Sequence, residues 1–302
     1  MQSSGVVRLA CATVILSAAA ASSVHAQAAG AQPGWAAVEQ ALGRAGAAQP
    51  DGVMRFSFPR SDLHVTVDGV QIRPALALGS WLAFRRVPGG AMAMGDLVLT
   101  DDEVAPVMAR LQQGGVDQTA VHNHLLRESP RVMYMHVEAH GDAVRIAQTV
   151  RAALALTHTP LGAPSPPAPA APIELDTGAV ARALGHAGRV NGGVYQVSVP
   201  RRDTIRDGGH GVPPAMGVAT AINFQPTGGG RAAVTGDFVM TAGEVNAVIR
   251  ALRSNGIEVT ALHSHLLNEQ PRLFFMHFWA NDDAVKLARG LGAALSHMAV
   301  RR

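Results

Sequence analysis

Three histidines occur at the same spacing in two separate blocks of this 302-residue chain. In each block two histidines are separated by one residue, and a third follows twelve residues later. Each histidine of the second block lies 141 positions after its counterpart in the first. The first set is His122, His124 and His136, and the second set is His263, His265 and His277. Two copies of one unit predict a tandem repeat, and polar residues that match in both copies are candidates for a shared site.

Three neutral imidazoles are a donor set that suits Zn, Cu, Fe or Ni. Cys11 is the only cysteine, so the rest of the chain offers no thiolate ligand. We therefore predict a divalent metal, Zn or Cu, at the second set of histidines and a weaker equivalent at the first set. The matched Glu128 and Glu269 could each add a ligand. Glu269 could instead be the general base on a metal-bound water, which would make the protein a metal-assisted hydrolase.

Strand parity would bring the three imidazoles of each set to one face of a sheet. Residues 259–266 and 273–279 are typical of two strands joined by a turn, and alternate residues of a strand point to the same face. If Leu267 pairs with Leu273, His263 lies opposite His277, and the same register places His122 opposite His136. Directly opposed Cβ atoms are about 5 Å apart, within reach of one ion. A slip of one residue would send the third histidine to the other face.

Two non-catalytic functions fit the same residues. Half-buried histidines bonded to the backbone or to nearby acids would form a structural network in a cell-envelope protein. A small ligand could instead bind the apolar face around Phe274, Phe275 and Trp279. Asp96 and Asp237 each follow a glycine, which is typical of a turn, although either could add a metal ligand.

The surrounding pattern predicts an α+β fold of two homologous tandem domains related by a pseudo-twofold axis. Each unit has about three helices and several strands of period two, which favours a mostly antiparallel sheet. Thr100 with Glu103, and Thr241 with Glu244, have the spacing of capping boxes at helix starts.

Composition shifts divide the chain into four parts. Residues 1–26 resemble a signal peptide, with Arg8 before the apolar stretch 9–21 and a cleavage site near Ala26. Residues 35–157 form the first repeat, 158–172 a Pro/Ala-rich linker, and 173–302 the second repeat. We therefore expect a periplasmic or secreted protein.

The charge pattern indicates which classes of binding partner to expect. A formal net charge of +3 without clustered basic and aromatic residues argues against nucleic acid. We expect no membrane span after signal cleavage. A small-molecule ligand stays possible, and the oligomeric state is open.

Two long stretches of the second repeat carry a family resemblance: GGGRAAVTGDFVMTAGEVNAVIRALRSNGIEVTAL and HSHLLNEQPRLFFMHFWANDDAVKLARGL. They resemble the LppY/LpqO-type proteins, extracytoplasmic bacterial proteins whose repeated domain has no known function. The resemblance covers both units and is looser in the first. It implies an extracytoplasmic location but no activity, substrate or cofactor. Some members are lipid-anchored, and this chain lacks the cysteine that such an anchor requires.

Overall fold

Each repeat contains one six-stranded antiparallel sheet. The computed structural model describes Met1, residues 34–162 and residues 172–301, so most of the predicted signal peptide and of the linker lies outside the described residues. The first sheet has the order β1 (Ala47–Gln49), β2 (Val53–Pro59), β5 (Gly79–Val87), β6 (Gly90–Thr100), β9 (Val132–Gly141), β7 (Asp117–His122). The second has the equivalent order β10 (Arg189–Asn191), β11 (Val194–Pro200), β14 (Ala219–Gly228), β15 (Arg231–Met240), β17 (Phe274–Asp283), β16 (Glu258–His263).

Helices cover one face of each sheet. The first repeat contributes α1 (Ala36–Leu42), α3 (Asp101–Gln113) and α4 (Ala143–Leu154), and the second contributes α5 (Thr177–Leu184), α6 (Ala242–Ser254) and α7 (Ala284–Leu295). The short helix α2 (Pro74–Ala77) and the 3-10 turns η1 (Pro50–Gly52) and η2 (Pro214–Met216) lie in connections. The predicted α+β fold of two homologous domains is confirmed. Among the described residues, no helix is long and apolar enough to span a membrane.

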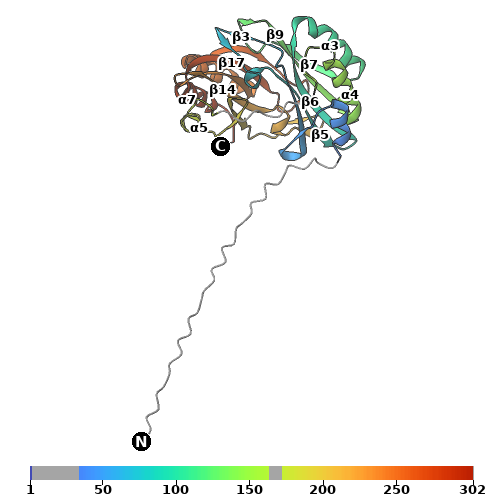
Figure 1. The fold of residues 1–302 in the computed structure, drawn as a ribbon, viewed down its shortest axis with the longest axis horizontal. Helices are drawn as coiled ribbons and strands as arrows, with labels where there is room; N and C mark the ends of the chain where they lie inside the picture. The colour runs from blue at the N-terminus through green and yellow to red at the C-terminus, as the bar shows by residue number, and fades with distance from the viewer. Residues whose placement is uncertain (2–33, 163–171, 302) are drawn as a thin grey trace. The chain divides into compact units, whose positions relative to one another are not determined.

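The uncovered faces of the two sheets meet each other. Two apolar clusters lie within single repeats, between a sheet and its own helices. Two further clusters combine buried residues of both repeats. The molecule is therefore layered as helices, sheet, sheet and helices. Figure 1 shows α3 and α4 on one outer side, α5 and α7 on the other, and strands between them.

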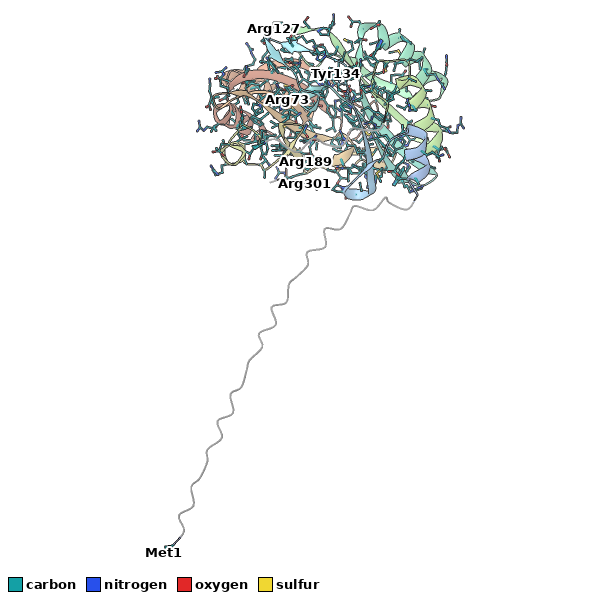
Figure 2. All side chains as sticks on the ribbon, viewed as in Figure 1. Met1, Arg73, Arg127, Tyr134, Arg189 and Arg301 are labelled. Carbon is teal, nitrogen blue, oxygen red and sulfur yellow. The ribbon has the colours of Figure 1, made fainter. Side chains whose placement is uncertain are left out.

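The period of two along β9 decides which side chains reach the interface between the repeats. Met135 and Val137 belong to the core under the helices. Tyr134 points the other way and belongs to a cluster shared with the second repeat. It is fully buried, whereas Arg127 lies at the surface (Figure 2). His136 alternates with Met135 and Val137 and so lies on the interface face with Tyr134.

Short hairpins flank the sheets. In the first repeat, β3 (Thr66–Val67) pairs with both β4 (Val70–Gln71) and β8 (Glu128–Ser129). In the second repeat, β12 (Arg206–Asp207) pairs with β13 (His210–Gly211), and Arg206 bridges to Gln270. These hairpins hold the loops that follow β7 and β16.

The pairing predicted for the histidine strands is wrong by two residues. Ala261, not His263, lies opposite His277, and Ala120 lies opposite His136. Strand β16 ends at His263, so the connection to β17 is longer than the predicted turn. Because the shift is even, the histidines keep the predicted face.

Each edge strand also contains a one-residue bulge, on the side of the histidines away from the connecting loop. The bulged residues are Thr119 and Thr260, which no partner-strand residue opposes. Each donates its hydroxyl across the interface, Thr119 to the carbonyl of His265 and Thr260 to the carbonyl of His124, both at 2.5 Å. The carbonyl groups of these histidines therefore bond to the other repeat instead of extending their own sheet.

Both predicted capping boxes form, at Thr100 with Glu103 and at Thr241 with Glu244. Each glutamate also binds an arginine that follows the proline at the end of β2 or β11. Arg60 Nη1 lies 2.7 Å from Glu103, and Arg201 Nη1 lies 2.6 Å from Glu244. These ion pairs join the sheet to the start of the helix that covers it.

We predict that Arg60→Met destabilises the protein more than Arg201→Met. The Arg60 side chain is 0% exposed and its partner Glu103 only 3%, whereas Glu244 is 13% exposed. Loss of one partner leaves a buried uncompensated charge, which costs about 3–5 kcal/mol. Denaturant unfolding measures both variants, with the exposed Arg253→Met as the control. Losses below about 1 kcal/mol for Arg60→Met would contradict this role.

Candidate metal centre

The six histidines of the two sets form one cluster between the two sheets. Each ring of the first set lies against a ring of the second set at a centroid distance of 3.7 Å. The rings of His122 and His263 and those of His136 and His265 are stacked, and those of His124 and His277 are tilted. The pairing follows the pseudo-twofold axis, since the last two pairs exchange equivalent residues. The sequence left open whether the two sets are separate, and the structure brings them together.

Two aspartates join the cluster from the neighbouring strands. Asp96 on β6 lies opposite His136, and Asp237 on β15 lies opposite His277. The turn role predicted for them is wrong, because both lie inside long strands. The preceding glycine has another purpose: a Cβ at Gly236 would lie 1.9 Å from the Ala221 carbonyl oxygen. Their identical placement in both blocks was the signal that sequence reasoning undervalued. We call the six histidines together with Asp96 and Asp237 the histidine centre.

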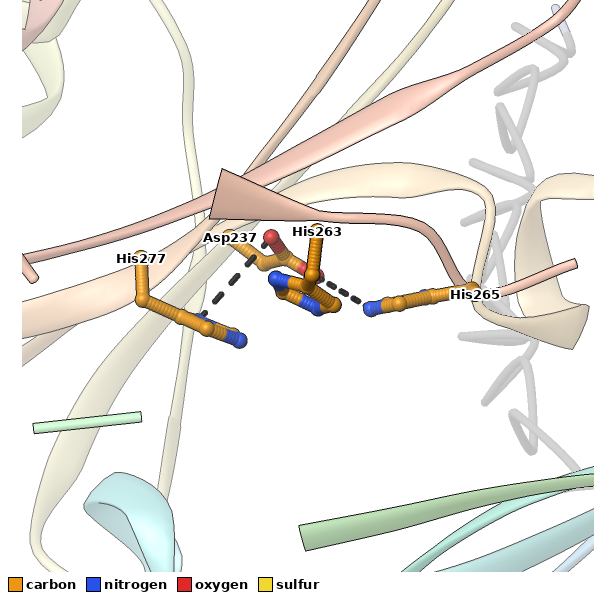
Figure 3. Close-up of side chains that lie close together, drawn as sticks. All are labelled: Asp237, His263, His265 and His277. Atoms are coloured by element: carbon orange, nitrogen blue, oxygen red, sulfur yellow. Dashed lines mark ion pairs between the residues drawn. The ribbon is translucent and has the colours of Figure 1, made fainter. Parts of the chain in front are cut away.

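The second repeat supplies a compact four-residue group (Figure 3). One ligand atom from each of Asp237, His263, His265 and His277 lies within 4.8 Å of all the others. Asp237 Oδ2 is 3.0 Å from His265 Nε2, and Asp237 Oδ1 is 3.9 Å from His277 Nδ1.

The first repeat supplies a looser equivalent. The ligand atoms of its three histidines meet the same 4.8 Å limit without Asp96. Asp96 Oδ2 lies 3.7 Å from His124 Nε2. The two halves of the centre therefore differ in how closely the carboxylate approaches.

The hydrogen bonds of the rings leave nitrogen atoms free. His277 Nδ1 donates to the carbonyl of Gly236 at 2.7 Å in the tautomer that leaves Nε2 as a lone-pair donor. Each of the six rings has at least one buried nitrogen without a hydrogen-bond partner among the described residues. The buried oxygens Asp96 Oδ1 and Asp237 Oδ1 also have no partner there. The His265–Asp237 approach is short but lacks the direction of a ring N–H bond. Buried polar atoms are normally paired, so this concentration of unpaired donors is unusual.

Burial favours the neutral form of five of the six imidazoles. It lowers the pKa of His122 to about 3, with a further contribution from His277. Burial also lowers the pKa of His263 and His277, and it holds the pKa of His124 and His136 well below the ordinary value. Neutral imidazole is the form that binds metal.

The two aspartates differ in charge. Burial, helped by the negative charge of Asp237, raises the pKa of Asp96 to about 8. For Asp237, burial acts to raise the pKa, but the His277 and His265 rings outweigh it and lower the pKa. Without a bound cation, Asp237 is charged and Asp96 is protonated at neutral pH.

The two glutamates proposed from the sequence lie outside these groups. Glu269 is buried, and its carboxylate accepts from the Leu273 N–H at 2.8 Å and from Arg272 Nη1 at 3.2 Å. Glu128 accepts from the Val132 N–H at 3.3 Å. Each carboxylate therefore accepts from the backbone amide four residues later, and this bond stabilises the loop that connects the two histidine-bearing strands of its repeat.

Aromatic rings close the ends of the centre. Tyr134 stacks on His124 with a centroid distance of 3.2 Å, and its counterpart Phe275 stacks on His265 at 3.5 Å. The Tyr134 hydroxyl donates to the Ala77 carbonyl at 3.0 Å, so this ring is fixed at both ends.

A family model described as Domain of Unknown Function (DUF1259) matches residues 36–156 and again residues 178–297. The chain belongs to this family. Both histidine sets lie inside the matched segments, so the histidine centre is assembled from two copies of the family domain. A comparison with curated proteins gives no match.

Two solved structures show a weak overall likeness. One is a trimeric bacterial microcompartment shell protein, PduB, with 13% identity, 82% of this chain and 88% of that chain covered, and a TM-score of 0.20. The other is EtuB from Clostridium kluyveri, with 10% identity, coverage of 83% and 90%, and the same TM-score.

We predict that metal-free protein loses stability in mild acid partly through His122. Between pH 6.5 and about pH 3 the unfolded chain protonates this residue while the folded chain does not, so stability falls as the pH falls. At pH 5 the loss is on the order of 2 kcal/mol relative to pH 7. Denaturant unfolding between pH 5 and pH 7 should therefore show a shallower pH dependence for His122→Gln.

The comparison with His122→Gln is needed because the titration of Asp96 changes the stability with pH in the opposite direction to that of His122. Its raised pKa makes the folded state bind the extra proton, so its contribution is lost as the pH rises toward 8. An identical pH dependence in wild type and His122→Gln would show that the His122 ring is not kept neutral by burial.

Proposed function

We propose that the protein is an extracytoplasmic metal-binding protein whose histidine centre holds a divalent transition metal, Zn or Cu by preference. Imidazole and carboxylate donors suit these ions, and no cysteine after residue 11 competes for them. The compact group of Asp237, His263, His265 and His277 is the main site, and the first set with Asp96 is the weaker one.

The observation that carries the proposal is the set of buried ring nitrogens without hydrogen bonds. A structural hydrogen-bond network would pair these atoms, because an unpaired buried polar atom costs about 1–3 kcal/mol. A bound cation satisfies several of them at once. The same observation argues against the alternative of a purely structural histidine network.

The arrangement is close to what an ion requires. Zinc binds imidazole nitrogen at about 2.0–2.1 Å in tetrahedral geometry, which places ligand atoms roughly 3.4 Å apart. Ligand atoms within 4.8 Å of one another reach that spacing by small rotations of the side chains. The Gly236 carbonyl already orients His277, as outer partners do in metal sites.

Metal binding is favoured over metal-assisted hydrolysis. A catalytic zinc site keeps one position open for water, whereas the second repeat offers four protein ligands. Glu269, the base suggested by the sequence, would have to leave both the Leu273 amide and Arg272 to reach a bound water. A small-ligand carrier is disfavoured too, because Phe275 and Trp279 are buried in the clusters between the repeats.

The extracytoplasmic location rests on the sequence. Residues 1–26 have the charge and apolar pattern of a signal peptide, and both units resemble the LppY/LpqO-type proteins. We propose that the protein is a non-lipidated relative of that type, released to the periplasm or exterior after cleavage near Ala26.

Zinc titration of metal-free protein tests the proposal. The wild type should bind Zn²⁺ tightly and unfold at a higher temperature with it, because a ligand that binds only the folded state stabilises it. Loss of an outer partner alone costs about 10–100-fold in metal affinity. Replacement of two ligands in His263→Ala/His265→Ala should therefore weaken binding by more than about 100-fold. His122→Ala/His124→Ala should weaken it less.

The control is His64→Ala/His297→Ala, which removes two exposed histidines outside the centre and should leave binding unchanged. Absence of both binding and thermal stabilisation with Zn²⁺ and Cu²⁺ would refute the proposal. Equal losses in the control and in the second-set variant would show adventitious surface binding.

A further inference from the structure

The interface between the repeats is not symmetric at its two ends. Position 138 on β9 corresponds to position 279 on β17, since each lies two residues after the third histidine of its set. In the second repeat the position holds Trp279, which is buried in an apolar cluster with Val67. In the first repeat it holds Glu138, and the residue that matches Val67 is Asp207. An apolar contact at one end is thus replaced by two carboxylates at the other.

A histidine completes the acidic end. His140 follows Glu138 on the same face of β9 and has Asn281 as its counterpart. Its Nε2 lies 3.3 Å from Glu138 Oε1 and 3.8 Å from Asp207 Oδ2. One ligand atom from each of the three residues lies within 4.8 Å of the other two. Two residues come from the first repeat and one from the hairpin β12–β13 of the second.

The two carboxylates of this group are buried. The Asp207 side chain is only 5% exposed and the Glu138 side chain 11% exposed. Asp207 Oδ1 is buried and has no hydrogen-bond partner among the described residues. Two carboxylates so close together and so little solvated repel each other when both are ionised, and a cation between them removes the repulsion.

His140, the third residue of the group, leaves a path from solvent to the two carboxylates. The His140 side chain is 39% exposed, so the group opens to solvent on the side of this ring. An ion can enter there and keep water ligands, which a site with only three protein ligands requires. Mixed carboxylate and imidazole donors suit Mn²⁺ and Zn²⁺.

We propose that Glu138, His140 and Asp207 form a second divalent-metal site, distinct from the histidine centre, that binds Mn²⁺ or Zn²⁺ and links the two repeats. The site exists only at one end of the interface, because Trp279, Asn281 and Val67 occupy the equivalent positions at the other end. Its ion would bridge β9 of the first repeat to the β12–β13 hairpin of the second. The proposal does not depend on the histidine centre.

Binding of Mn²⁺ to the full chain, followed by electron paramagnetic resonance of the free ion, tests this site. The wild type should bind Mn²⁺, and Glu138→Gln, His140→Asn and Asp207→Asn should each weaken that binding at least about tenfold. The histidine-centre variant His263→Ala/His265→Ala should retain it. The exposed His64→Asn is the matched control for loss of an imidazole.

Thermal unfolding gives a second measurement on the same variants. The stabilisation by Mn²⁺ should disappear in Glu138→Gln and Asp207→Asn, because each of these variants loses a carboxylate ligand. His140→Asn changes an exposed side chain and covers the case in which a carboxylate variant fails to fold. Binding of Mn²⁺ that survives all three substitutions, or that is lost only in His263→Ala/His265→Ala, would overturn the proposal. Wild-type protein that binds no Mn²⁺ and no Zn²⁺ beyond the histidine centre would overturn it as well.

Discussion

Burial of polar rings between two sheets is the constraint on which this structure depends. A sheet has two faces, and here the helices of each repeat cover only one of them. The second face must be covered by the other repeat, and it carries histidines and an aspartate at its centre. Because these side chains lose water when the repeats meet, their nitrogens and oxygens need new partners. The stacked rings exclude water but offer few hydrogen bonds in return. The middle of the interface is therefore also the part with the strongest demand for an outside ligand.

The sequence predicted the local structure well because local structure obeys short-range rules. The spacing of Thr100 and Glu103 led to a capping box, and the period of two placed His263 and His277 on one face. The pairing of individual residues failed because the connection after β16 is longer than the predicted turn and is bound to the other repeat, where Thr119 donates to the His265 carbonyl. No pattern within a single repeat carries that contact.

The meeting of the two histidine sets was beyond reach for the same reason. Each block predicts three rings on one face but not what covers that face. Asp96 and Asp237 were misassigned as turn residues since a glycine before an aspartate is common in turns. In this fold the glycine is required by the close approach of β5 or β14, as the short Cβ contacts at Gly95 and Gly236 demonstrate. The matched position of the two aspartates in both copies was a better predictor of their place in the site than the residues next to them in sequence.

The two copies of the domain place equivalent residues on both sides of the interface. Differences between single equivalent residues then make the two sides unequal in charge. Asp96 and Asp237 are equivalent in position, yet only Asp237 is ionised in the metal-free state, because burial and the charge of Asp237 raise the pKa of Asp96. A cation would attract both carboxylates and so release the proton from Asp96, which couples ion binding to proton release. At the two ends of the interface, Glu138 and Trp279 occupy equivalent positions. Glu138 belongs to a group that could bind a cation, whereas Trp279 packs in an apolar cluster. An interface built from two copies of one domain can in this way hold non-equivalent sites without any change of fold.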